Sequence, residues 1–179
     1  MAELITPRAE YLWSYLEACK GFKEKGLAIS NTHDPDDFEN WRHVIFQRFA
    51  DHKKGLNLPA GYVPESAFWL VEEGEFIGVG SIRHRLTPLL EQRGGHIGYM
   101  IRCDKWGQGY GTIQLGYLLR EAAKLGIKSA LITCNENNIA SAKVMEKNGA
   151  IYQDTVEIME NEGITRIKRY WVSTPGSKP

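Results

Sequence analysis

The sequence has no excess of charge of either sign. It carries 22 lysines and arginines against 22 aspartates and glutamates, so its formal net charge at pH 7 is +0. Proteins that bind nucleic acid or anionic membranes through their overall charge have a clear excess of basic residues. The balance therefore predicts neither of these partners, and it favours a discrete site for a small molecule.

Cysteines and long apolar segments are scarce as well. The three cysteines, Cys19, Cys103 and Cys134, are widely separated and lack the spacing of a metal site or a redox pair. This pattern predicts reduced thiols in a reducing compartment. No segment approaches the ~20 apolar residues that span a bilayer, and residues 1–4 show no basic start leading into an apolar run. We expect a cytoplasmic protein.

Internal repeats, low-complexity tracts and linkers between domains are also absent. A chain of 179 residues with 42% hydrophobic residues has the size and composition of one compact domain. We expect a single domain over 1–179, in which 1–66 form an N-terminal strand and two helices and 173–179 form a tail. The core sheet and the binding site are expected within 67–172.

Apolar periodicity and turn residues predict alternating helices and strands. Thr6-Pro7 and Asp34-Pro35 are signals that begin helices, and Gly26 and Gly55 end them. Residues 86–93 are polar and are expected to be irregular. The pattern predicts helices at 6–26, at 35–55 and at 139–148, and another that follows a glycine-rich run and ends at 125. It predicts strands at 68–71, 76–85, 96–102, 129–134, 152–158 and 164–172. Such an order indicates a mixed α/β sheet with helices on both faces.

The most informative segment is the glycine-rich run 106–112, which reads WGQGYGT and leads into an amphipathic helix. Closely spaced glycines let successive N–H groups point toward an anion at a helix N-terminus. A nucleoside triphosphate loop would need Gly-Lys-Ser/Thr, which is missing. A dinucleotide loop would need G-x-G-x-x-G after the first strand, and the spacing here is G-x-G-x-G. A phosphate cradle remains the favoured interpretation beside a purely structural turn.

Two stretches carry a family resemblance. HIGYMIRCDKWGQGYGT, from His96 to Thr112, and LITCNENNIASAKVMEKNGA, from Leu131 to Ala150, resemble the coenzyme A binding half of the GNAT superfamily of N-acetyltransferases, and in particular a subgroup of bacterial predicted acetyltransferases. The resemblance implies a mixed, mostly antiparallel central sheet of six to seven strands, splayed between the fourth and fifth strands, with helices on both faces. It also implies acetyl-CoA as the acetyl donor, no metal, and transfer to a primary amine of a small molecule or peptide. The sequence leaves monomer and homodimer both open.

The resemblance assigns the cofactor site residue by residue. Main-chain N–H groups of the glycine-rich run are expected to hold the pyrophosphate, with Trp106 in place of the usual Arg or Gln. The strand before the run is expected to pair with the peptide-like pantetheine arm. Asn138 is expected to cap a helix, to bind pantetheine, or to do both. The complete predicted set is Met100, Ile101, Arg102, Trp106, Gly107, Gln108, Gly109, Tyr110, Gly111, Thr112, Asn138 and Ser141.

The catalytic groups are less well defined. Acetyl transfer to an amine needs a proton acceptor. The two candidates are His96, at a place where relatives have a Glu, and His84. For each of them a structural role is the alternative. Met145 occupies the place of the tyrosine that protonates coenzyme A in many members, so a catalytically silent acyl-CoA binding or sensing module is the alternative function. Three arginines, Arg83, Arg85 and Arg93, are candidates for holding an acidic acceptor, and solvated loop charges are the other interpretation.

Overall fold

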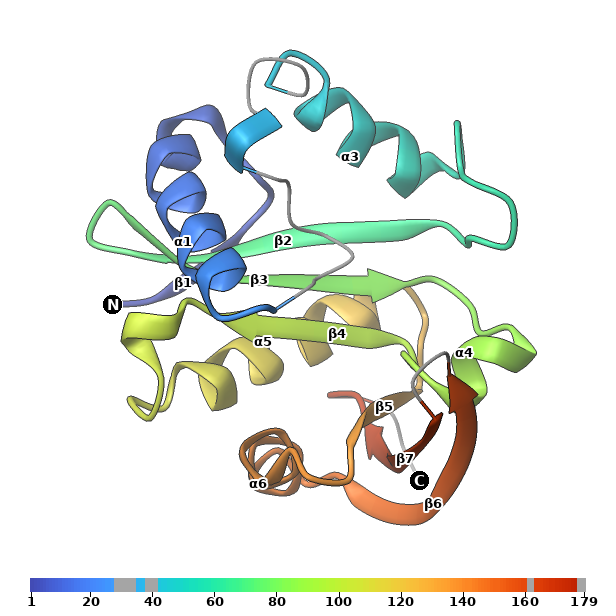
Figure 1. Ribbon diagram of the computed structural model, residues 1–179. Helices are drawn as coiled ribbons and strands as arrows, with labels where there is room; N and C mark the ends of the chain where they lie inside the picture. Colours follow the sequence, from blue (N-terminus) through green and yellow to red (C-terminus); the bar gives the residue numbers. More distant parts are fainter. Residues whose placement is uncertain (28–34, 38–41, 161–162, 177–179) are drawn as a thin grey trace.

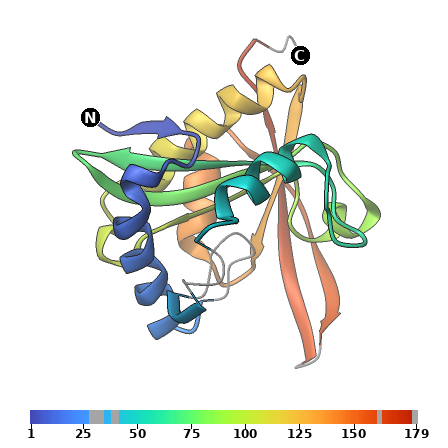
Figure 2. The same ribbon diagram turned by 90° about the horizontal axis from the view of Figure 1, so that it is seen from above.

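Two antiparallel sheets form the framework of the molecule. The computed structural model describes residues 1–27, 35–37, 42–160 and 163–176. The first sheet has the order β1 (Glu3–Ile5), β2 (Glu65–Glu72), β3 (Glu75–Arg83) and β4 (Ile97–Ile101). The second has the order β5 (Ser129–Asn135), β7 (Gly163–Ser173) and β6 (Ile151–Glu160). Figure 2 shows the long β6–β7 hairpin projecting away from the first sheet.

Helices cover both faces of the first sheet. On one face, α1 (Leu12–Glu24) packs against β3 and α3 (Ile45–Lys54) against β2; on the other, α5 (Tyr110–Lys124) crosses β3 and β4 (Figure 1). The helix α6 (Ile139–Lys147) packs against α5 and β5. The short helix α4 (Pro88–Gln92) and the 3₁₀ turns η1 (Ala9–Tyr11), η2 (Pro35–Asp37) and η3 (Cys103–Lys105) complete the described elements.

Each face has its own apolar core. Beneath α1, Tyr15 stacks on Trp69 with ring centroids 4.7 Å apart, and Phe76 meets Trp69 edge-on at 5.5 Å. Beneath α5, Leu118 is fully buried, and a Cβ atom added to Gly80 would lie 2.7 Å from its Cδ1 atom. Because Gly80 has no side chain, α5 can lie directly on β3, and this contact fixes the position of the helix that follows the glycine-rich run.

The two sheets meet where the chain enters β4. The N–H of His96 donates to the Leu131 carbonyl at 2.7 Å, and the N–H of Leu131 donates to Nδ1 of His96 at 3.0 Å. No strand ladder joins β4 to β5, so the sheets diverge from this junction. The predicted mixed α/β fold, with six to seven strands splayed between the fourth and fifth and helices on both faces, is thus confirmed, and its strands form an antiparallel group of four and one of three.

Two predicted elements differ from the structure. Residues 42–44 form a turn and α3 begins at Ile45, so the Asp34-Pro35 signal, which produces the 3₁₀ turn η2, does not begin one continuous helix up to Gly55. Phe38 and Trp41, predicted on that helix, lie outside the described residues. Residues 86–93 contain α4 where irregular chain was expected, and the Thr87 hydroxyl caps it by accepting the Leu90 N–H at 3.3 Å.

Candidate functional site: a phosphate loop beside the splayed strands

The glycine-rich run forms a loop with an open main chain. Gly107 and Gly109 have φ values of 75° and 88°, a left-handed conformation that favours glycine. A Cβ atom at either position would meet no protein atom within 4 Å. The helix α5 begins at Tyr110 without a side-chain cap, and within the described chain no acceptor is seen for the N–H groups of Gly107, Gly109, Tyr110 and Gly111. Free donors at a helix N-terminus fit a pyrophosphate.

The side chains of the loop are used to anchor it. The Trp106 indole donates to the Ile101 carbonyl at 2.7 Å, and the Gln108 amide donates to the Asp104 carbonyl at 3.2 Å. The Tyr110 hydroxyl donates to Glu72 of β2 at 2.5 Å. These bonds fasten the loop to β4, η3 and β2, so its main chain remains the part available to an anion.

The strand β4 is predicted to pair with pantetheine through main-chain N–H and C=O groups, and fewer of these than expected are free at the C-terminal end of the strand. The N–H of Arg102 donates to the Ile77 carbonyl at 2.9 Å, and the Arg102 carbonyl accepts from Lys105 at 3.0 Å. The Ile101 carbonyl is taken by Trp106. The Arg102 guanidinium is buried and bound to Asp104 and to the Phe76 carbonyl. The structure thus uses Arg102 to hold the end of β4.

The N-terminus of α6 faces β4. Oδ1 of Asn138 accepts the N–H of Ser141 at 3.0 Å, as the capping interpretation requires, and this leaves the amide donor of Asn138 for a ligand. The Ser141 hydroxyl lies 3.0 Å from the hydroxyl of Tyr99, which also donates to the Ser141 carbonyl at 3.3 Å. Burial raises the pKa of Tyr99 to about 12. Tyr99 is not among the predicted site residues, although strand alternation places it on the face of β4 opposite to that of His96, which precedes the strand.

His96 lies at the junction of the two sheets. Because its Nδ1 accepts the Leu131 N–H, the neutral ring carries its proton on Nε2. Burial lowers the pKa of His96, and the charge of Arg83 adds to this effect, so the ring is neutral at pH 7. The edge of Trp171 faces the ring at 6.3 Å. His96 therefore joins β4 to β5, and its assignment as a base remains a prediction.

The other predicted candidate base, His84, has different surroundings. Its Nε2 atom lies 2.8 Å from the hydroxyl of Ser66 on β2. Burial lowers its pKa, and the charge of Lys53 contributes in the same direction. His84 thus contacts the start of β2, whereas His96 contacts β5.

Two of the three arginines considered for an acidic acceptor already have carboxylate partners. Arg83 is bound to Glu65 at 3.2 Å, with both side chains largely buried, and donates to the Gly94 carbonyl at 3.1 Å. Arg93 forms an ion pair with Glu160. Arg85 is exposed. Of the three, Arg85 is the one to which the described structure gives no carboxylate partner.

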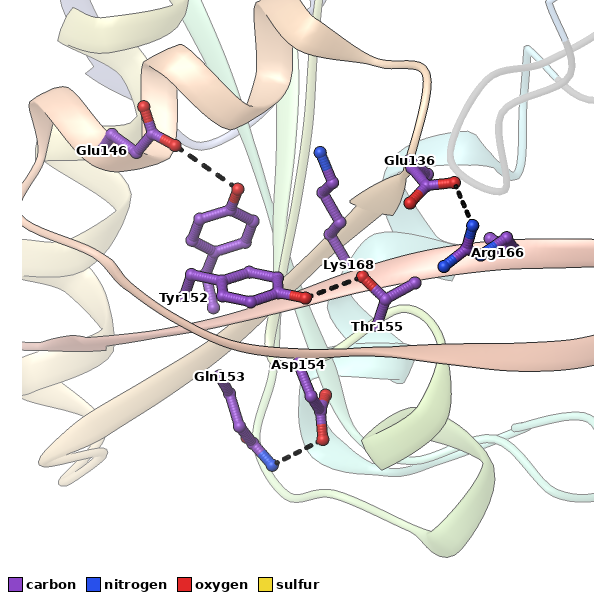
Figure 3. A pocket seen from close by; sticks show the side chains of 9 residues that line it. Glu136, Glu146, Tyr152, Gln153, Asp154, Thr155, Arg166 and Lys168 are labelled. Carbon is purple, nitrogen blue, oxygen red and sulfur yellow. Dashed lines mark hydrogen bonds and ion pairs between the residues drawn. The ribbon is translucent and has the colours of Figure 1, made fainter.

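A separate cavity of about 710 Å³ lies on the second sheet beside α6. Figure 3 shows Tyr152, Thr155 and Lys168 on its strands, with Glu146 of α6 above them. None of its lining residues belongs to the predicted cofactor set. Within residues 1–27, 35–37, 42–160 and 163–176, no helix has the length and apolar character needed to cross a membrane, and no group of three acidic, histidine or cysteine side chains is arranged to hold a metal.

Several solved structures share this architecture. The ribosomal-protein acetyltransferase RimL in complex with coenzyme A superposes with a TM-score of 0.70 at 19% identity, over 96% of this chain and 93% of that one. RimJ of Mycobacterium smegmatis, in complex with CoA-disulfide, gives a TM-score of 0.73 at 14% identity, over 98% and 85%. The self-immunity acetyltransferase MccE, in complex with acetyl-CoA and AMP, gives 0.69 at 16%, over 96% and 92%. At these identities the likeness shows a common fold.

Family membership comes from the sequence itself. No curated protein matches the chain. The family model described as the acetyltransferase (GNAT) domain matches residues 17–151, which include the second half of α1, the first sheet from β2 onward, the glycine-rich loop and α6. The chain therefore belongs to the GNAT acetyltransferases, a family of enzymes that take the acetyl group from acetyl-CoA.

Proposed function

We propose that this enzyme transfers the acetyl group of acetyl-CoA directly to a primary amine of a small molecule or peptide. The observation that carries the proposal is the left-handed Gly107–Gly109 loop with its free N–H groups at the start of α5. When bound, the cofactor would supply an activated acetyl thioester. The loop would hold its pyrophosphate, and the unpaired side of β4 would accept the pantetheine arm as an added strand.

The acceptor side would be the face of β4 that carries Gly98. A Cβ atom on Gly98 would lie 3.5 Å from the Ser81 hydroxyl and 3.8 Å from the Arg83 guanidinium, so these groups share one face. The absence of a side chain there leaves room for an amine to approach the thioester. Because RimL is named an alpha-N-protein acetyltransferase, peptide α-amines are the first acceptor class to examine. The proposal includes a cytoplasmic location, which three widely spaced cysteines that form no disulfide favour.

His96 is proposed to act on the amine, as either base or positioning group. As a base it would have to release the Leu131 N–H in order to accept the proton at Nδ1. As a positioning group it would keep β4 and β5 joined at the closed end of the splay. His84, bound to Ser66, is the second candidate base.

Two measurements test the proposal. Acetyl-CoA at 100 times its Kd would stabilise the fold by about 2.7 kcal/mol, so a thermal shift at millimolar ligand is expected. Thiol release would then be followed across a panel of peptides with free or blocked N-termini and of small primary amines. No thermal shift would contradict the cofactor assignment. A shift without thiol release from any acceptor would favour the silent acyl-CoA binding module, for which the buried Met145 argues.

A further inference from the structure

The bond that breaks in acetyl transfer is the carbon–sulfur bond of the thioester, and its electron pair passes to sulfur. Relatives that carry a tyrosine on α6 place a hydroxyl near this sulfur, whereas this chain has Met145 there. Met145 is fully buried and has no donor hydrogen. Another hydroxyl, either Ser141 at the start of α6 or one from a neighbouring element, must therefore meet the thiolate, or solvent must do so.

Tyr99 is the hydroxyl that the fold brings to the splay. It lies in the middle of β4, between the junction at His96 and the anchored end at Ile101, and points to the α6 side, where it packs against the core beneath α5. Its hydroxyl is 3.0 Å from the Ser141 hydroxyl at the start of α6. The thiol of Cys134, on β5, is close enough to affect the Tyr99 pKa. Tyr99 therefore lies where β4, β5 and α6 face one another.

Two other tyrosine hydroxyls lie on the second sheet. Tyr170 is buried and its hydroxyl donates to Glu146 at 3.4 Å, and the Tyr152 hydroxyl pairs with Thr155 at 2.9 Å. Both lie on the second sheet beside the cavity of Figure 3, which contains neither β4 nor the loop. They are therefore unsuited to meet a pantetheine arm that runs along β4.

We propose that the Tyr99 hydroxyl donates a hydrogen bond to the sulfur of coenzyme A as the thiolate leaves, with Ser141 donating to the Tyr99 oxygen. This inference rests on the proposed function. It requires only that the Tyr99 hydrogen turn from the Ser141 carbonyl toward the ligand while the Ser141 hydroxyl supports the phenol oxygen. A hydrogen bond from the Ser141 hydroxyl polarises the Tyr99 hydroxyl and strengthens the hydrogen bond that Tyr99 donates.

The proton remains on Tyr99 throughout. Burial places the Tyr99 pKa at about 12, well above the ~8.5 typical of a thiol, so the phenol stabilises the thiolate without ionising. The amine nitrogen forms the new bond to the acetyl carbon and loses its proton to a base or to solvent. The thiolate later takes a proton from solvent. Atoms and charges balance without a further reactant.

The test compares coenzyme A with desulfo-coenzyme A, which lacks the sulfur, in the wild-type enzyme and in Tyr99→Phe. The phenylalanine keeps the ring packing and removes only the hydroxyl. A hydrogen bond to a charged sulfur is worth 1–2 pKa units, so the pKa of the bound thiol, followed by the ultraviolet absorbance of the thiolate, is expected to rise by about that much in Tyr99→Phe. Affinity for desulfo-coenzyme A is expected to stay unchanged. Tyr170→Phe, another buried tyrosine losing a hydroxyl, is the matched control and should change neither value.

The outcomes separate the inference from the function on which it rests. An unchanged thiol pKa in Tyr99→Phe would overturn the inference, as would an equal loss of affinity for both ligands, which indicates a purely structural hydroxyl. A shift in Ser141→Ala but none in Tyr99→Phe would transfer the role to Ser141 and would also overturn it. If the wild-type protein binds neither ligand, the proposed function itself fails.

Discussion

Valine substitutions at Gly109 and at Gly126 distinguish a glycine needed for ligand binding from one needed only for its left-handed backbone conformation. Gly109 has φ +88° and Gly126, at the other end of α5, has φ +80°, and a Cβ atom at either position would contact no protein atom within 4 Å. A β-branched residue in this conformation costs roughly 2 kcal/mol. Gly109→Val and Gly126→Val should therefore lose similar stability, about 4–8 °C in Tm for a chain of this size.

Only the Gly109 variant should also lose the cofactor. Its side chain would occupy the space into which the free N–H groups of the loop point, and two charge-assisted bonds lost at ~1.5 kcal/mol each amount to about 3 kcal/mol, or a hundredfold in Kd. Isothermal titration with coenzyme A on both variants, below their unfolding temperatures, measures this difference. Equal affinities in Gly109→Val and Gly126→Val would refute the assignment of the loop as a pyrophosphate site.

Three further predictions concern groups around the splay. If His96 is a base, both His96→Ala and His96→Asn should lose turnover in a steady-state assay while coenzyme A affinity is kept. If His96 only joins β4 to β5, His96→Asn should retain turnover, because the asparagine side chain can still accept the Leu131 N–H. Asn138→Ala should cost about 1 kcal/mol in urea unfolding, and Asn138→Ser, which keeps a capping oxygen, should regain stability yet bind coenzyme A more weakly if the amide contacts pantetheine. Burial lowers the pKa values of His52, His84 and His96, so the unfolded state binds more protons than the folded state. The free energy of unfolding should therefore decrease as pH falls below ~6.5, and a flat profile between pH 7.5 and 5.5 would contradict this.

Much of the fold could be predicted because its signals are local. The helix α5 follows from apolar residues spaced at three and four positions, and Gly126 ends it within one turn. The start of α3 could not be placed in the same way. Pro35 offers a helix-start signal and lies in the 3₁₀ turn η2, but residues 42–44 form a turn and α3 begins at Ile45, which is fully buried. Burial of that side chain, a tertiary effect, outweighs the local signal.

The candidate site was predictable where the main chain defines it and less so where side chains do. Positive φ at Gly107 and Gly109 follows from residue type and spacing. The partners of Arg83 and Arg93 depend on carboxylates from other elements, Glu65 and Glu160, which no spacing rule connects to them. The contact of Tyr99 with Ser141 joins residues 42 positions apart and forms only when α6 packs beside β4. Long-range contacts of this kind decide which charges and hydroxyls remain available for chemistry.

If the proposed sites for the amine and the thiolate are right, they lie on opposite faces of β4. Met100 packs toward α1, and Gly98 shares its face with Ser81 and Arg83, whereas Tyr99 packs toward α5 and α6. Neighbouring residues of a strand point in opposite directions. The amine would therefore reach the acetyl carbon from the Gly98 side of the strand, and the thiolate would leave it on the Tyr99 side. The effect on turnover of substitutions on the Gly98 face should therefore differ from one acceptor amine to another. The effect of substitutions at Tyr99, which act on the thiolate, should be the same for every acceptor.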